Sequence, residues 1–442
     1  MAISRRAFVA RNDFICSTNM RDCEALAGEV IARCQTLARF SEDAGSIRRT
    51  FLSQPMRDCH REVARWIAPL GATSRVDAAG NLRVHYPTEV AGNAPRLLIG
   101  SHLDTVPNAG AYDGILGVVL AISLLGVFKN IRLPFALEVV GFSEEEGVRF
   151  GVPFIGSRAL VGTLDEELLN RRDAHGISIR KAIENFGLNP AELPSAAVHD
   201  EVLGYIEFHI EQGPVLESLG RPLGVVEAIA GQSRLEFTFM GRANHAGTTP
   251  MNLRHDALAG AAEWIGAVER HAQGASQHSF GLVATVGSIQ ARPSAGNVIA
   301  GKTRLSLDVR HQSDEARQRA VDYFVRQAED IATRRGLSVR WSVLMDQPTA
   351  LMDPFLVSQV EDAVGRTRCN PYRMVSGAGH DAMIMAEKVP SAMIFLRTPG
   401  GISHDPAESV NPTDVANAIG CGVHLVEQLA SSSEFRRKTP HA

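Results

Sequence analysis

Histidine and acidic side chains recur in short segments of this chain, each at a place where a strand or a turn is expected. Neutral imidazole nitrogens and carboxylate oxygens are ligands that zinc, manganese or cobalt accept, and these segments contain no cysteine thiolate. The segments are 101–105, 110–114, 143–147 and 204–213, followed by His404 in a glycine-rich loop.

The first two segments are weak signals when each is taken alone. His102 and Asp104 follow the apolar run 97–99, and residues two apart on a strand share a face. Asp104 is therefore expected to accept a hydrogen bond from the ring of His102, which would fix its tautomer. A structural histidine remains the better reading of that pair by itself. Asp113 alone is better read as the cap of the helix that follows it.

The later segments strengthen the metal interpretation. Three adjacent carboxylates, Glu144 to Glu146, follow the apolar run 135–142 and repel one another unless they are solvated or neutralised by a cation. His209 and Glu211 share a face at another strand end. A histidine, an aspartate, a glutamate pair and two further histidines, in that order, predict a two-metal site with nitrogen and oxygen ligands.

The region 20–229 must position these side chains. Amphipathic or apolar stretches predict helices over 21–40, 54–70 and 114–128, and buried-type runs predict strands over 96–100 and 135–142. Such alternation predicts a mainly parallel sheet with helices on both faces, in which chemistry gathers at the strand ends. The same texture resumes after residue 354, so residues 20–229 and 344–442 are expected to form one discontinuous catalytic domain.

A different pattern occupies residues 230–343. Apolar and polar residues alternate over 235–239, 282–289 and 303–310, and helical stretches cover 254–272 and 314–335. With a last strand over 338–344, the order is strand–helix–strand–strand–helix–strand. This order predicts an inserted α/β sandwich of the ferredoxin-like type. The predicted fold class is therefore α/β with an inserted domain.

Bulk properties exclude several functions. The formal net charge is -4 and no long basic run occurs, which argues against nucleic acid as a partner. No apolar stretch approaches the ~20 residues that span a bilayer. The six cysteines are scattered without a C-x-x-C pair, as in a reducing cytoplasm. Ser4-Arg5-Arg6 resembles an export signal, but Arg11, Asn12 and Asp13 follow after four apolar residues, so no apolar h-region forms. Residues 1–19 are therefore expected to be a disordered or misassigned start of a cytoplasmic protein.

At this point the motifs identify a family. The chain resembles the M20-type metallohydrolases, in the branch of allantoate amidohydrolases, N-carbamoyl-L-amino-acid amidohydrolases and β-ureidopropionases. The resemblance covers nearly all of residues 20–429. It rests on GSHLDTVPNAGAYDG (100–114), FSEEEGVRFGVPFIGSRAL (142–160), HIEQGPVLE (209–217), GRANHAGTTPM (241–251), GNVIAG (296–301), SLDVRH (306–311), SGAGHDA (376–382) and GISHDPAE (401–408).

The resemblance implies two divalent metal ions per subunit, zinc or manganese, with cobalt or nickel also acceptable. One carboxylate should bridge them and a neighbouring glutamate should act as the general base. The implied roles are Asp113 as bridge, His102 and His209 on one metal, Glu145 and His404 on the other, Glu144 as base, and Asp104 as an orienting catalytic residue.

The resemblance also implies substrate contacts. His245 and Asn297 should hold the developing oxyanion, and Arg310 should grip a substrate carboxylate. Gln212 and His380 are expected beside the substrate and the metals. Without the resemblance, the residues alone favour a packed His245, a turn-capping Asn297 and an ion-paired Arg310.

The implied activity is hydrolysis of a ureido C–N bond next to a carboxylate, releasing ammonia and carbon dioxide. A homodimer formed through the inserted lid domain is expected. The segment 104–114 favours allantoate, with N-carbamoyl-L-amino acids and β-ureidopropionate as alternatives. An aminopeptidase or deacylase is the further alternative, although His209 stands where many related peptidases carry a carboxylate. A non-enzymatic relative is disfavoured because every implied ligand and the base are present.

Overall fold

The computed structural model describes residues 20–86, 95–198, 202–275, 281–432 and 435. The extension expected over residues 1–19, with its arginine pair, lies outside these described residues. Within them, no helix combines the length and the apolar character needed to cross a membrane. The chain divides into two compact units: unit 1 holds 1–227, 352–373 and 380–442, and unit 2 holds 228–351 and 374–379. Each unit is described by itself.

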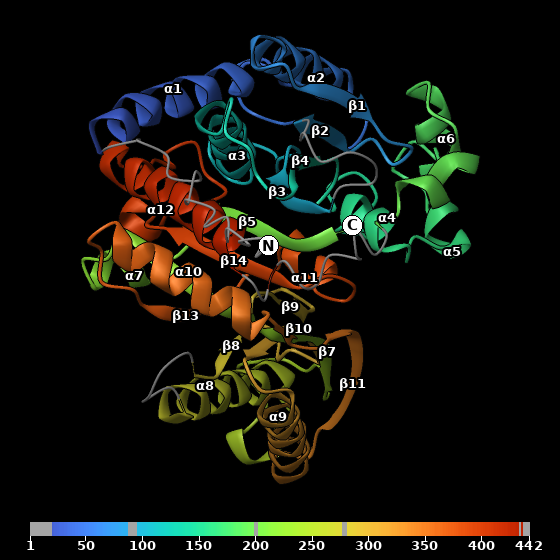
Figure 1. Ribbon diagram of the computed structural model, residues 1–442. Helices are drawn as coiled ribbons and strands as arrows, with labels where there is room; N and C mark the ends of the chain where they lie inside the picture. Colours follow the sequence, from blue (N-terminus) through green and yellow to red (C-terminus); the bar gives the residue numbers. More distant parts are fainter. Residues whose placement is uncertain (1–19, 87–94, 199–201, 276–280, 433–434, 436–442) are drawn as a thin grey trace, which may run out of the picture. The chain divides into compact units, whose positions relative to one another are not determined.

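A mixed sheet forms the centre of unit 1 (Figure 1). Within unit 1 its order is β1-β2-β4-β3-β5-β14-β6. The inner strands β4, β3, β5 and β14 run parallel, while the outer pairs are antiparallel, which confirms the predicted α/β class with its mainly parallel sheet. The strands are β1 (Thr73–Val76), β2 (Leu82–Tyr86), β3 (Arg96–His102), β4 (Ala136–Phe142), β5 (Val202–Ile210), β6 (Leu223–Ile229) and β14 (Ser391–Leu396).

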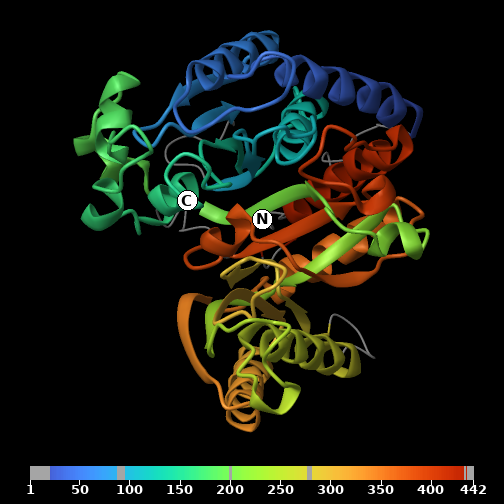
Figure 2. The ribbon, with the colours of Figure 1, turned by 180° about the vertical axis from the view of Figure 1, so that it is seen from behind.

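Helices cover this sheet because its inner strands are apolar on both faces. Every residue of β4, β5 and β14 is buried, as expected for parallel strands between helical layers. Helices α1, α3, α10 and α12 pack together, and α11 packs on α4 (Figure 2). The helices are α1 (Met20–Ala38), α2 (Gln54–Ile67), α3 (Ile115–Val127), α4 (Ile155–Val161), α5 (Glu166–Leu169), α6 (Ile179–Asn185), α7 (Val215–Ser218), α10 (Pro354–Arg366), α11 (Asp381–Met385) and α12 (Pro412–Ser431).

The close approach of α3 to β5 depends on one glycine. A Cβ at Gly117 would lie 2.0 Å from the backbone oxygen of Phe208, so no other residue fits there without backbone movement. Helix α3 is apolar all round and buried along nearly its whole length. Helix α3 begins directly after the turn that carries Asp113. Its close packing on the sheet therefore fixes the position of that turn.

Unit 2 contains a separate antiparallel sheet with the order β11-β7-β10-β8, and β9 pairs with β10. Two helices pack on this sheet, as the strand–helix–strand–strand–helix–strand pattern predicts. The elements are β7 (Gly231–Met240), α8 (Ala257–Ala275), β8 (Val283–Thr285), β9 (Ile289–Arg292), β10 (Lys302–His311), α9 (Asp314–Arg334) and β11 (Ser338–Gln347).

Two details differ from the sequence analysis. The single strand expected over 282–289 is divided into β8 and β9, which pair with different parts of β10. Strand β11 continues to Gln347, beyond residue 343 where the insertion was expected to end, because it pairs with the full length of β7. Whether unit 2 acts as a lid or a dimerisation domain stays a prediction.

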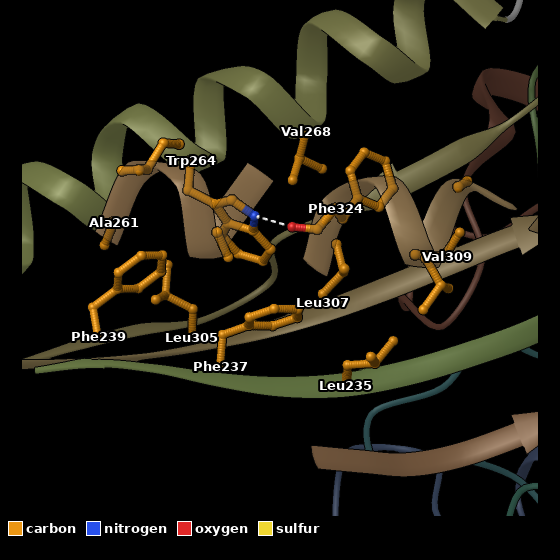
Figure 3. Packing of buried hydrophobic residues seen from close by; sticks show 14 of the residues in the cluster. Leu235, Phe237, Phe239, Ala261, Trp264, Val268, Leu305, Leu307, Val309 and Phe324 are labelled. Atoms are coloured by element: carbon orange, nitrogen blue, oxygen red, sulfur yellow. Dashed lines mark hydrogen bonds between the residues drawn. The ribbon is translucent and has the colours of Figure 1, made fainter. Parts of the chain in front are cut away.

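Figure 3 shows the core of unit 2, which gathers around Trp264 of α8. The indole is fully buried, its ring centroid lies 4.3 Å from that of Phe237, and its Nε1 donates to the backbone oxygen of Phe324 at 2.9 Å. The inward residues of β7 alternate with its more exposed ones, so Leu235, Phe237 and Phe239 all reach this core. A single large side chain thus joins both helices to the sheet.

Trp264→Ala is expected to lower the free energy of unfolding of unit 2 by about 3–5 kcal/mol, because it leaves a large cavity and removes a buried hydrogen bond. Chemical denaturation followed by circular dichroism measures this. Leu258→Ala is the matched control, since Leu258 lies on the same helix and is 41% exposed. Equal losses in the two variants would contradict the central role of Trp264.

Candidate metal centre

Neighbouring parallel strands bring the first two histidines together. His102 is the last residue of β3 and His209 lies near the end of β5, and these strands pair directly. Both rings are buried and stack with centroids 5.5 Å apart. The turn of Asp113 approaches His102 closely because Gly114 (φ +70°) has no side chain; a Cβ there would lie 2.4 Å from the ring. The sheet edge therefore collects these groups at one point.

The tautomer of each ring follows from its backbone partner. The Nδ1 of His102 donates to the backbone oxygen of Asp104 at 3.1 Å, and the Nδ1 of His209 donates to that of Ile210 at 2.8 Å. Both Nε2 atoms are then unprotonated in the neutral rings, and they face each other at 3.3 Å. Two lone pairs pointing at one place repel each other unless a cation lies between them.

Asp113 completes the first group of ligand atoms. Its Oδ1 lies 3.2 Å from the Nε2 of His209 and 3.8 Å from that of His102, and it is buried without a hydrogen bond to any described residue. His102, Asp113 and His209 offer ligand atoms within 4.8 Å of one another. Two imidazole nitrogens and an orphaned carboxylate oxygen fit a divalent cation, because they supply lone pairs and no proton.

A second group of ligand atoms shares the other oxygen of Asp113. The Nε2 of His404 lies 3.1 Å from Asp113 Oδ2 and 3.4 Å from Glu146 Oε1. Asp113, Glu146 and His404 form a group within the same 4.8 Å limit. Burial, and next the charge of Asp113, raise the pKa of Glu146 to about 7, so this pair of carboxylates favours a cation beside it. Asp113 is therefore placed to bridge two cations.

The three glutamates are grouped differently from the assignment made from the sequence. Glu145 was expected beside His404, but Glu146 lies there, and Glu145 lies with His102 and Glu146 in a third group of possible ligands. The reason is local: β4 ends at Phe142, so the alternation of a strand does not continue through the three glutamates. The side chain of each is then set by the loop and not by the sheet.

The expected base, Glu144, is also displaced from the candidate metal groups. It is fully buried, and neither of its carboxylate oxygens has a hydrogen-bond partner among the described residues. Burial, and next the charge of Asp104, raise its pKa well above the ordinary value. Glu144 is in none of the candidate metal groups formed by the described residues, whereas Glu145 belongs to one of them, with His102 and Glu146. Burial and then Glu146 raise the pKa of Glu145 well above its ordinary value.

The carboxylate of Asp104 positions the loop of the three glutamates more directly than it positions the ring of His102. Its Oδ1 and Oδ2 accept hydrogen bonds from the backbone amides of Glu145 at 2.9 Å and of Glu146 at 3.0 Å. The carboxylate lies 3.5 Å from the Nδ1 of His102, while its own backbone oxygen is the nearer acceptor at 3.1 Å. The sequence therefore predicted the residue that accepts the hydrogen bond of the His102 ring. The accepting atom is the backbone oxygen of Asp104 and not its carboxylate, because His102 is the last residue of its strand.

Gln212 and His380 both lie at this centre. The Nε2 of Gln212 donates to Asp113 Oδ2 at 2.9 Å and lies 3.4 Å from the Nε2 of His404. Gln212 and His404 both adopt positive φ, at 59° and 56°, a conformation that costs free energy in residues other than glycine. His380 is buried against His209, with ring centroids 4.4 Å apart.

Two supporting residues had no role in the sequence analysis. Glu408 accepts hydrogen bonds from the amides of Tyr112 at 2.8 Å and Asp113 at 3.1 Å, so it holds the bridging turn. The buried guanidinium of Arg49 donates to the backbone oxygen of Leu103 at 2.7 Å. Glu408 stands in the GISHDPAE segment and could have been singled out there, but nothing near Arg49 in the sequence signals its contact.

His245 and Asn297 lie together within unit 2. An isolated bridge pairs His245 with Val298, and the backbone oxygen of Asn297 accepts from the amide of Ala246 at 2.9 Å. The Nδ1 of His245 accepts from the amides of Gly247 at 3.0 Å and Thr248 at 3.2 Å. The ring proton of the neutral form must then be on Nε2, which is a hydrogen-bond donor on an exposed side chain.

Arg310 is half-buried and already has one carboxylate partner. Its Nε donates to Asp308 Oδ1 at 2.9 Å and its Nη2 donates to Asp308 Oδ2 at 3.2 Å, while Nη1 donates to the backbone oxygen of Gly377. A guanidinium has five N–H groups, so one on Nη1 and one on Nη2 are left for a further acceptor. Asp308 thus orients the fork of Arg310 without using all of it.

Comparison with known proteins agrees with this centre. The family described as "Peptidase family M20/M25/M40" matches residues 98–428. An allantoate deiminase of Arabidopsis thaliana is 37% identical over 439 residues, covering 92% of this chain and 82% of that protein. An N-carbamoyl-L-amino acid amidohydrolase of Geobacillus stearothermophilus is 37% identical over 392 residues, covering 88% and 95%.

A solved structure shares the whole architecture. An amidase of the hydantoinase/carbamoylase family from Burkholderia multivorans superposes with a TM-score of 0.85 at 30% sequence identity, covering 92% of this chain and 98% of that one. The matched family region contains all the clustered histidine and acidic residues described above. The chain therefore belongs to the M20/M25/M40 peptidase family, among its relatives that hydrolyse C–N bonds other than peptide bonds.

Proposed function

We propose that this protein is an amidohydrolase that cleaves a ureido C–N bond of allantoate, releasing ammonia and carbon dioxide. The observation that carries the reaction class is the convergence of two unprotonated Nε2 atoms on a buried, unbonded oxygen of Asp113. The allantoate deiminase and the N-carbamoyl-L-amino acid amidohydrolase have the same sequence identity to this chain, 37%. The substrate choice follows the resemblance of segment 104–114, and N-carbamoyl-L-amino acids and β-ureidopropionate remain the alternatives.

Two divalent cations, zinc or manganese, are proposed for the centre. His102 and His209 would hold one, Glu146 and His404 the other, and Asp113 would bridge them through its two oxygens. Such cations, when bound, lower the pKa of a coordinated water and polarise a substrate carbonyl. The donor set supports this proposal because it contains only imidazole nitrogens and carboxylate oxygens, with cobalt and nickel as further candidates.

Glu145 is proposed as the general base in place of Glu144. Its carboxylate lies beside the candidate ligand atoms, and burial keeps its proton affinity high. It would take a proton from the attacking water and deliver that proton to the leaving nitrogen as the C–N bond breaks. Asp104 would keep the carboxylate in place through the amide of Glu145.

His245, Asn297 and Arg310 are proposed as substrate contacts, on the basis of the local geometry of unit 2. The Nε2–H of His245 and the side-chain amide of Asn297 could donate to an oxygen that gains negative charge in the transition state. The two remaining N–H groups of Arg310 could bind the substrate carboxylate. Gln212, already in contact with Asp113, would limit the space around the reacting carbon.

Ammonia release by the purified, manganese-loaded protein tests the proposal. Allantoate, β-ureidopropionate and several N-carbamoyl-L-amino acids are the substrates, a dipeptide panel is the comparison, and a chelator is the control. Chelator-sensitive release that is fastest with allantoate is the expected result. Faster ammonia release from a carbamoyl amino acid would make that compound the preferred substrate in place of allantoate. Dipeptide cleavage without ammonia release would mean that the reaction is peptide hydrolysis and not ureido hydrolysis.

Arg310→Lys is expected to raise KM for allantoate by about tenfold or more with a smaller change in kcat, because an ammonium cannot reproduce the fork. Steady-state kinetics measure both constants. Arg234→Lys is the matched control, because Arg234 also pairs with Asp308 but its side chain is 52% exposed. An unchanged KM in Arg310→Lys would remove this residue from the substrate site.

A cytoplasmic homodimer formed through unit 2 is also proposed, from the resemblance. The exposed apolar side chains of β11, Trp341, Val343 and Leu344, support a partner on that strand. Light scattering coupled to size exclusion is expected to give twice the chain mass of 47.7 kDa. A single-chain mass at micromolar concentration would overturn the dimer.

A further inference from the structure

A cavity of about 310 Å³ lies in unit 1, lined by α2, β1, the start of β2 and the segment that follows α6. Its size is at the lower end of the range usual for small-ligand sites, ~300–1,000 Å³. None of the residues described at the metal centre lines it. The lining residues are Arg57, His60, Arg61, Ala64, Ser74, Arg75, Val76, Leu82, Phe186, Gly187 and Leu188.

The charge of the cavity is unbalanced. Three arginines line it, and no acidic side chain does so among the residues that the structure describes. His60 and Arg61 lie three and four residues after Arg57, and four and three residues before Ala64, so the four residues share one face of α2. Arg61 is paired with Asp58. The backbone of Arg75 pairs with Arg83 in the sheet, but its side chain makes no hydrogen bond or ion pair in the described part of the chain. Positive charge therefore remains for a ligand.

Arg57 is held in place at the wall. Its Nη2 donates to the backbone oxygen of Phe186 at 2.7 Å, and its guanidinium carbon lies 3.9 Å from the centroid of the Phe186 ring. Stacking and one hydrogen bond fix the guanidinium plane while leaving several N–H groups unused. An arginine held in this way loses little further freedom when it binds an anion.

His60 supplies an independent sign of a ligand. Its ring is 95% buried, lines the cavity and meets Phe186 edge-on, yet neither ring nitrogen has a hydrogen-bond partner among the described residues. Burial, and next the charges of Arg49 and Arg57, lower the pKa of His60 to about 3, so the ring is neutral and offers one donor and one acceptor. Buried polar groups normally have hydrogen-bond partners. Two ring nitrogens without such partners at a cavity wall therefore indicate that a ligand binds there.

We infer that this cavity binds a small organic anion, whose negative group meets Arg57, Arg75 and His60 and whose apolar part packs on Phe186, Leu188 and Leu82. The arginines explain the anion, since guanidinium groups bind carboxylate or phosphate oxygens in a charge-assisted fork. Apart from Ser74, the remaining lining side chains are apolar, and a bare inorganic ion would leave them in contact with water. This site is separate from the proposed reaction and does not depend on it.

Calorimetric titration of the full-length, metal-loaded protein tests the inference with benzoate, which joins a carboxylate to an apolar ring, and with inorganic phosphate. Arg75→Gln is expected to weaken benzoate binding by about tenfold or more while ureido hydrolysis stays unchanged. Arg75 is exposed and its side chain makes no hydrogen bond or ion pair in the described part of the chain, so loss of folding is not expected. Arg57→Gln should weaken binding as well, although it also removes the bond to Phe186.

Arg65→Gln is the matched control, because Arg65 lies on the same helix, 75% exposed and paired with Glu62 outside the cavity. It removes the same charge and is expected to bind benzoate like the wild type. Benzoate binding that is absent in the wild type, or equally weakened in Arg65→Gln and Arg75→Gln, would overturn the site. Phosphate should bind about tenfold more weakly than benzoate, and equal affinities would overturn its apolar part.

Discussion

Replacing Glu145 by glutamine is expected to lower kcat for ureido hydrolysis by about 10²–10⁴-fold, the usual contribution of a general base. The amide keeps the size of the side chain but cannot take a proton from water. The backbone amide of residue 145 still donates to Asp104, so the loop and Glu146 should stay in place. Metal content, measured by plasma mass spectrometry, and KM are therefore expected to remain close to wild type.

Glu144→Gln is the control that separates the two neighbouring glutamates. Glu144 is buried away from the candidate metal groups, with no hydrogen-bond partner for its carboxylate among the described residues. A neutral amide is expected to be tolerated there, with kcat within a few-fold of wild type. The reverse pattern, an active Glu145→Gln and an inactive Glu144→Gln, would restore the assignment made from the sequence.

This difference shows what the sequence could and could not predict. The ligands at strand ends, His102 and His209, follow from the apolar runs before them, because neighbouring parallel strands end at one edge of the sheet. The glutamates follow β4 in a loop, where no periodicity tells which side chain turns inward. The direction of these side chains depends on Asp104, which is distant from them in the sequence. Its carboxylate accepts hydrogen bonds from the backbone amides of Glu145 and Glu146.

The fold follows the same rule. The parallel sheet of unit 1 and the two-helix sandwich of unit 2 were predictable because periodicity reports which face of an element is buried. The division of one expected strand into β8 and β9 was not, since it depends on how each pairs with β10. The cavity beside His60 is also invisible in the sequence, because its walls come from α2, two strands and the segment after α6.

Asp113→Asn is expected to have the widest effect of any single change, because both oxygens of this carboxylate face candidate ligands. Oδ1 lies 3.2 Å from the Nε2 of His209 and Oδ2 lies 3.1 Å from that of His404. An amide presents one oxygen and one NH₂ group, so it cannot bridge two cations and removes a negative charge between them. Metal content is expected to fall from the proposed two ions per chain to one or none, and ammonia release from allantoate by more than about 10³-fold.

The matched comparison is Asp405→Asn, because Asp405 follows His404 in the sequence but is exposed, and among the described residues its carboxylate accepts a hydrogen bond from the backbone amide of Ala407 alone. Both variants lose one charge, so a general electrostatic effect would lower metal content equally. The bridging role of Asp113 requires that Asp405→Asn keep its metal and its activity. If Asp113→Asn retained two ions per chain, the cations would be held by separate ligand sets, and the convergence of His102, His209 and His404 on one carboxylate would need another cause.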